Sequence, residues 1–152
     1  MADNSSNILE EGRNYNFKVL KSISLYNDEN YFVLEAPSKN KYLLNSSLYK
    51  YYNILKNTTI KCKVDKINCN GRIFLEPEHP YLKEGNKYVF KVDTIEELLG
   101  KDKEQVLIVI DDKGITHTAI LNRHLKLKEI PKHINAKINR ISKARLYLEV
   151  AN

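Results

Sequence analysis

Hydrophobic and polar residues alternate along two stretches of the chain that closely resemble each other. The alternating apolar residues are Tyr15, Phe17 and Val19 in one stretch, and Tyr88, Phe90 and Val92 in the other. A period of two is typical of a half-buried strand, because successive side chains of a strand point to opposite faces of the sheet. We therefore predict a strand in each stretch, with these residues in the core.

These two strands belong to a longer repeat. Three segments return 73 or 74 residues later and in the same order. The pairs are 11–19 and 84–92, 60–67 and 134–141, and 72–76 and 145–149. Such constant spacing indicates that one small module is written twice. We predict a disordered tail over 1–10, a first domain over 11–80 and a second over 81–152.

The remaining pattern predicts two hairpins in each copy. Strands two and three are expected at 31–35 and 41–44 in copy one, and at 106–110 and 115–120 in copy two. The closing hairpin of copy one turns at Asn70-Gly71, a dipeptide that strongly favours hairpins.

Between strands three and four the alternation stops. In 46–55 apolar residues recur at helical spacing behind a serine that can cap a helix, and 122–127 takes the same place in copy two. We predict a short helix in each segment. A capping-box pattern at Thr94 to Gly100 also predicts an acidic helical turn in the first loop of copy two.

Three strands, a short helix and a two-stranded hairpin follow the order of the OB fold, a five-stranded Greek-key barrel. The predicted fold class is therefore all-β, with two tandem OB barrels. An SH3-like barrel is the main alternative, although it normally lacks the intervening helix.

Two segments resemble a known family. Residues 64–76, VDKINCNGRIFLE, resemble the closing hairpin of the S-one-type RNA-binding domain. Residues 114–121, GITHTAIL, are similar to the third strand of that family. The resemblance implies an OB barrel and RNA as the ligand.

Charge and cysteine content narrow the functional classes. The net charge of +6 suggests a polyanionic partner, and the basic residues are concentrated in 50–72 and 113–145. Cys62 and Cys69 have no histidine at ligand spacing, so we expect free thiols, no metal and no cofactor. With a polar N-terminus and no long apolar run, the expected location is the cytoplasm.

Candidate binding residues follow from strand parity and from their position in the hairpins. Phe74 and Tyr147 alternate with inward residues of the last strand of each copy, so they should point outward as stacking surfaces. The expected phosphate-binding cations flank the two closing turns: Lys66, Arg72, Arg140, Lys143 and Arg145. On strands two and three the candidates are Tyr31 or Phe32, together with Tyr42 and His117. For Phe74 and Tyr147 the alternative is a contact between the two barrels or cover from a neighbouring loop. For the cations it is an ordinary solvated turn, for Phe32 core packing, and for His117 exposure at a sheet edge.

No nucleophile, paired carboxylate or phosphate-binding loop is recognisable in the sequence, so we expect no enzymatic activity. The predicted function is binding of single-stranded RNA or DNA. The alternative is an adaptor that holds a protein partner through a tyrosine-rich surface formed by Tyr49, Tyr51 and Tyr52.

Overall fold

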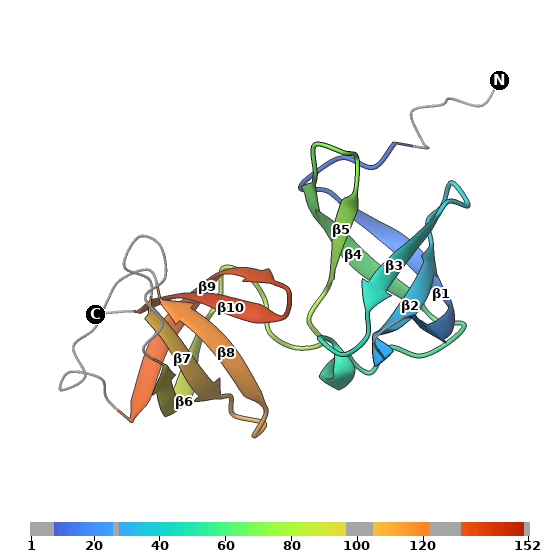
Figure 1. The fold of residues 1–152 in the computed structure, drawn as a ribbon. Helices are drawn as coiled ribbons and strands as arrows, with labels where there is room; N and C mark the ends of the chain where they lie inside the picture. Colours follow the sequence, from blue (N-terminus) through green and yellow to red (C-terminus); the bar gives the residue numbers. More distant parts are fainter. Residues whose placement is uncertain (1–7, 26–27, 97–104, 122–131, 151–152) are drawn as a thin grey trace. The chain divides into compact units, whose positions relative to one another are not determined.

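The computed structural model describes residues 8–25, 28–96, 105–121 and 132–150. The chain divides into two compact units, Met1–Pro80 and Tyr81–Asn152. Both units are all-β, and the described residues contain one 3-10 helix but no α-helix (Figure 1).

The first unit is a five-stranded antiparallel sheet in the order β3-β2-β1-β4-β5. Its strands are β1 (Asn14–Ser24), β2 (Asn30–Glu35), β3 (Lys41–Asn45), β4 (Thr59–Ile67) and β5 (Ile73–Pro77). The strands predicted from the alternating pattern of this copy are confirmed.

The second unit is a closed barrel in the order β10-β8-β7-β6-β9. Its strands are β6 (Lys87–Glu96), β7 (Gln105–Ile110), β8 (Thr116–Leu121), β9 (His133–Ser142) and β10 (Arg145–Val150). Four of the five strand pairs are antiparallel, and the parallel pair of β8 with β10 closes the barrel.

One long strand in each unit pairs with two neighbours. The first half of β1 pairs with β4 and the second half with β2; β6 pairs with β9 and β7 in the same manner. A register shift lies between Val19 and Lys21 in β1, and between Val92 and Thr94 in β6. Such bulges bend a strand and increase its twist, so one long strand can pair with two neighbouring strands along different halves of its length.

The most similar part of the repeat is explained by the turn that precedes this strand. The hydroxyl of Tyr15 accepts a hydrogen bond from the backbone N–H of Glu10 at 2.9 Å, and Tyr88 accepts one from Lys83 at 2.9 Å. Gly12 and Gly85 adopt φ values of +88° and +90°, which favour glycine. The Glu-Gly-x-x-Tyr motif therefore stabilises the entry into each sheet.

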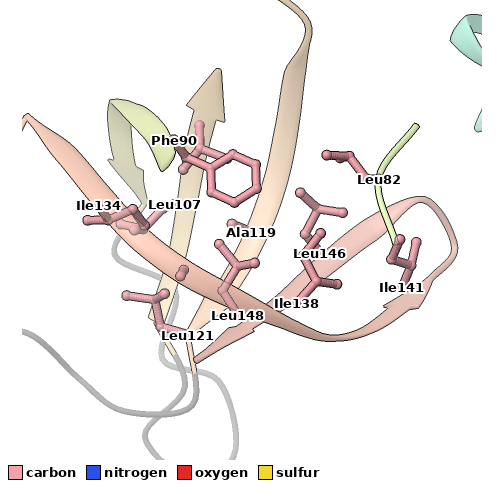
Figure 2. Close-up of a cluster of buried hydrophobic side chains, with 12 residues drawn as sticks. Leu82, Phe90, Leu107, Ala119, Leu121, Ile134, Ile138, Ile141, Leu146 and Leu148 are labelled. Carbon is pink, nitrogen blue, oxygen red and sulfur yellow. The ribbon is translucent and has the colours of Figure 1, made fainter. Parts of the chain in front are cut away.

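The core of the second unit consists of aliphatic residues around one aromatic ring (Figure 2). Phe90 and its repeat counterpart Phe17 in the first unit are both fully buried. Cys62 and Ala136 occupy the same inward position in the two copies, and both are fully buried. Burial, followed by the negative charge of Glu76, raises the pKa of Cys62 to about 12, so its thiol stays protonated.

The first unit lacks a backbone ladder between its edge strands β3 and β5. A side-chain hydrogen bond spans this place instead: the buried Tyr49, which follows β3, donates its hydroxyl to Glu76 of β5 at 2.7 Å. Burial raises the pKa of Tyr49, and the neighbouring carboxylate raises it further. Tyr49 therefore remains a donor at all physiological pH values.

The predicted short helix of 46–55 is wrong in extent. Only Lys50–Tyr52 form a helix, a single 3-10 turn that ends at Asn53 in the left-handed conformation. Aromatic residues have weak helix propensity. A single 3-10 turn already places residues i and i+3 on the same side, so Tyr49 and Tyr52 can both pack into the first unit without a longer helix. The second predicted helix, in 122–127, lies outside the described residues.

Two further expectations need correction. Thr94 does not begin a helix, because this β-branched residue continues β6 opposite Ile108. The rest of that predicted turn, 97–100, lies outside the described part.

Leu9, assigned to a disordered tail, is buried with only 6% of its surface exposed. Leu82 stands 73 residues later and is likewise buried, so the repeat begins earlier than we predicted.

The hairpin turn between strands two and three offers a test of backbone strain. Lys39 has φ +75° where the second unit has Gly114 at φ +81°, and both N–H groups close the same kind of turn. A Cβ at Gly114 would meet no atom within 4 Å, so only its dihedral angles oppose a larger residue. We expect Gly114→Ala to lower the free energy of unfolding by about 1 kcal/mol.

The converse change, Lys39→Gly, should raise the free energy of unfolding by about 0.5 kcal/mol, since glycine's freedom in the unfolded chain offsets part of the relieved strain. Urea denaturation measures both changes. Asp112→Ala, an exposed substitution in the same turn as Gly114, is the control. If Asp112→Ala lowered the free energy of unfolding as much as Gly114→Ala does, the positive φ of Gly114 would not be the cause of the destabilisation.

Candidate nucleic-acid interface

The closing hairpin of the first unit carries an aromatic ring with a cation above it. Phe74 of β5 is half-buried and lies opposite the exposed Lys66 of β4. The guanidinium carbon of Arg72 lies 4.9 Å from the centre of the Phe74 ring. A register shift between Val64 and Lys66 precedes this pair. The predicted residues of this hairpin therefore lie together.

The closing hairpin of the second unit repeats the arrangement with a different arginine. Tyr147 of β10 is half-buried between the buried Leu146 and Leu148, and it lies opposite Arg140 of β9. The guanidinium carbon of Arg140 lies 4.9 Å from the centre of the Tyr147 ring. The cation comes from the facing strand here, and from the turn in the first unit.

The turn of this second hairpin is strained. Lys143 and Ala144 have φ values of +52° and +61°, the conformation of a tight hairpin turn in which asparagine and glycine are preferred. Arg145 begins β10 directly after it and pairs with Ser142. Lys143 is an exposed residue of this turn.

The first unit adds Tyr31, which the sequence left open as the alternative to its neighbour Phe32. Tyr31 of β2 is half-buried, and its hydroxyl donates to Glu29 at 2.6 Å. This hydrogen bond raises the pKa of Tyr31, whereas the positive charge of Arg72 opposes the rise. Tyr31 is therefore within electrostatic range of the β4–β5 turn. Because alternate residues of a strand face opposite sides, an inward Leu34 would have placed Phe32 inward and Tyr31 outward, which favours Tyr31 as the candidate.

Phe32 and Tyr42, the residues selected on strands two and three, share the inward face. Phe32 lies opposite the buried Leu44, and Tyr42 lies opposite the fully buried Leu34. The ring of Tyr42 also packs edge-to-face on the core residue Phe17, with 6.1 Å between the ring centres. Both side chains therefore contribute to packing rather than to an outer binding face.

His117 is also not an exposed residue of the interface. It lies opposite the fully buried Val109, and only 8% of its surface is exposed. Its Nε2 lies 2.7 Å from Oδ2 of Asp111. Strand parity places the ring inside the barrel and Asp111 holds it there, so this histidine is not part of an exposed binding face.

Asp111 organises the end of the second barrel. Tyr81 donates its hydroxyl to Asp111, and the backbone N–H groups of Lys113 and Ile115 donate to it at 2.9 and 3.0 Å. Burial alone would raise the pKa of this carboxyl group, but the hydrogen bonds from Tyr81, His117 and the backbone outweigh burial and lower it. The carboxylate is thus stabilised in its charged form.

The tyrosine cluster of the first unit is divided between core and surface. Tyr49 is buried, and its ring lies 5.0 Å from that of Tyr52, which in turn packs against His79 at 4.8 Å. Tyr51 alone is well exposed. A surface formed by all three tyrosines, as expected from the sequence, is therefore not present.

Other kinds of site were sought among the described residues. No group of three or more histidine, cysteine, aspartate or glutamate side chains in this part of the chain could hold a metal ion. Cys62 is a buried free thiol and Cys69 an exposed one. Within the described ranges, no helix has the length and apolar character needed to cross a membrane.

Comparisons with known proteins do not indicate a function, so the interpretation of the site depends on its geometry. No protein-family model matches the chain, and no curated protein matches it in sequence.

The lowered pKa of Asp111 predicts how stability changes with pH. A carboxyl group with a lower pKa in the folded state contributes stability above its unfolded pKa of 3.8, and loses that contribution as pH falls toward the folded value. The stability difference between the native protein and Asp111→Asn should therefore shrink as the solution is acidified below about pH 5. Urea denaturation over this range measures it.

Asp112→Asn, at an exposed position next to Asp111, serves as the matched control. The free-energy difference between this variant and the native protein should stay nearly constant over the same range. A constant difference for Asp111→Asn as well would contradict the proposed stabilisation of its charged form.

Proposed function

We propose that this protein binds single-stranded nucleic acid through two OB barrels and catalyses no reaction. The observation that carries the proposal is the ring with a guanidinium group above it, found at the same position on both closing hairpins. RNA is favoured over DNA because of the resemblance to the S-one-type domain.

The strand arrangement supports the OB assignment. The first strand of each unit pairs with the second and fourth strands, and in the second unit the third strand runs parallel to the fifth. This connectivity agrees with the one expected for a Greek-key barrel of the OB type. In such barrels the hairpin of strands four and five borders the ligand groove.

The chemistry of the hairpins suits a flexible polyanion. Phe74 and Tyr147 are half-buried, and an aromatic ring at such a site can stack on a base of any sequence, contributing about 1 to 3 kcal/mol per base. A guanidinium group that already lies over the ring can pair with the phosphate next to that base, because its planar N–H donors match phosphate oxygens. Stacking and phosphate pairing thus occur at one place in each unit.

The two units would contribute differently to binding. The second hairpin supplies three cations, Arg140, Lys143 and Arg145, and Arg140 lies over its ring. The first hairpin supplies Lys66 and Arg72, and Tyr31 of β2, which is within electrostatic range of Arg72, adds a second aromatic residue. We therefore assign more of the salt-dependent affinity to the second unit, and more of the stacking to the first.

The charge reversal Arg140→Glu, Lys143→Glu and Arg145→Glu tests the proposal. Binding of an unstructured oligouridine should weaken, and the slope of log affinity against log salt should fall by about 2, since about three phosphate contacts are lost at roughly 0.7 per contact. Fluorescence anisotropy at several salt concentrations measures both quantities.

Phe74→Ala with Tyr147→Ala should weaken binding with little change in the salt slope, because stacking involves no release of counterions. Ala144→Gly is the matched control: it relieves the strained turn beside Lys143 but leaves every charge and ring in place. Native affinity that is undetectable at low ionic strength, for both oligouridine and oligodeoxythymidine, would refute the function.

A further inference from the structure

The segment between β3 and β4 has two distinct sides. The N–H of Tyr49 donates to the carbonyl of Ser46 at 3.2 Å, and that of Tyr52 donates to the carbonyl of Tyr49 at 3.0 Å. In successive turns of this kind, residues three apart lie on the same side. Tyr49 and Tyr52 accordingly face inward, with ring centres 5.0 Å apart, and Leu48 and Tyr51 share another side.

The residues of that other side, and Leu55 shortly after the turn, are apolar and exposed. Leu48, Tyr51 and Leu55 have 45%, 60% and 56% of their surface exposed. Seven large hydrophobic residues are this exposed in the described part of the chain, and three of them lie within these eight positions. Single exposed apolar residues are ordinary, but a local concentration indicates a contact surface.

The backbone that carries these side chains is fixed to the sheet. The N–H of Asn57 donates to the carbonyl of Val19 in β1 at 2.7 Å, and the Thr58 hydroxyl donates to the carbonyl of Leu55 at 2.5 Å. Asn53 and Asn57 have φ values of +58° and +68°, a conformation that asparagine tolerates well. The apolar side chains are thus held on a preorganised support, which reduces the entropic cost of binding.

The charge of this segment selects the kind of partner. Lys50 and Lys56 are exposed in the same segment as the apolar residues, and no aspartate or glutamate occurs from 46 to 64. Glu76, which accepts the hydrogen bond from Tyr49, is buried on the inner side. The ammonium group of Lys50 lies 5.1 Å from the centre of the Tyr51 ring. We name Leu48, Lys50, Tyr51, Leu55 and Lys56 the connector face.

We propose that the connector face binds an acidic segment of a partner protein, in which large apolar side chains stand between aspartate or glutamate residues. Apolar side chains of the partner would cover Leu48, Tyr51 and Leu55, while its carboxylates would approach the two lysines. A nucleic acid fits less well, because two of the three apolar residues are aliphatic and offer no planar surface for stacking.

This surface is separate from the proposed nucleic-acid interface. The 3-10 turn lies near the end of β5, where Tyr52 contacts His79, whereas the β4–β5 turn precedes β5 and lies at the opposite end of the first unit (Figure 1). The same unit could therefore hold an oligonucleotide and an acidic peptide simultaneously. The protein would then connect a nucleic acid to an acidic protein.

A fluorescein-labelled peptide of alternating Asp-Glu and Leu-Phe pairs is the probe, and the intact chain is the receptor. We expect Leu48→Ser, Tyr51→Ser and Leu55→Ser together to weaken its binding by about tenfold or more, through loss of buried apolar area. Lys50→Glu with Lys56→Glu should weaken binding by about fivefold, and less at high salt. Anisotropy measures both.

Val89→Ser, a matched loss of an exposed apolar residue in the second unit, should leave peptide binding unchanged. Oligouridine affinity should stay unchanged in the serine variant, so the two proposals can fail separately. Because the lysine substitutions change only exposed charges, they test the proposal even if the serine variant does not fold.

Four outcomes would overturn the proposal. The native protein could fail to bind the peptide, or could bind equally well a peptide with lysine in place of its acidic residues. The serine variant could lose oligouridine affinity instead, which would make the face a nucleic-acid surface. A less cooperative thermal unfolding of the serine variant would show that the chain itself covers this face.

Discussion

Both units depend on one long strand that pairs along half its length with each of two neighbours. In β1 the change of partner occurs near the register shift between Val19 and Lys21, and in β6 near the shift between Val92 and Thr94. Without this bend the strand would stay flat, and its two neighbours could not curve toward each other. The position of the closing hairpin, and hence of Phe74 and Tyr147, follows from this geometry.

The two copies solve the same closure differently. In the second unit a parallel ladder between β8 and β10 completes the barrel, whereas in the first unit the hydrogen bond from Tyr49 to Glu76 links the segment after β3 to β5. This bond fixes Tyr49 on the inner side of the segment, while the neighbouring Leu48 and Tyr51 are exposed. The side-chain closure of the first unit thus lies beside the surface to which we assign a protein partner.

Much of the fold could be predicted from the sequence, because alternation reports directly which residues of a strand are buried. Phe17 and Phe90 were assigned to the core on this ground, and both are fully buried. The segment 46–55 was harder to predict, since an i, i+3 spacing fits an α-helix and a 3-10 turn equally well. Leu9 was missed because its role depends on a turn closed by Tyr15, a contact that no local pattern reveals.

For the candidate site, the sequence predicted some side-chain positions better than others. The rings and cations of each closing hairpin do lie together, because one tight turn fixes which side chains face each other; their binding of a ligand stays a prediction. The inward positions of Phe32, Tyr42 and His117 were not foreseen, since they depend on the register between β2 and β3 or between β7 and β8. A slip of one residue exchanges the two faces of a strand. Tyr31, the neighbour of Phe32, illustrates this sensitivity.

The cations over the two rings show why register matters for function as well. The repeat aligns Arg72 with Arg145, yet Arg140 lies over Tyr147. In both units the residue opposite the ring is basic: Lys66 in the first and Arg140 in the second. A planar guanidinium stacks on a ring better than a compact ammonium group does. The arginine that lies over each ring is therefore the one that the hairpin geometry brings within reach. It is not in both units the arginine at the aligned position of the repeat.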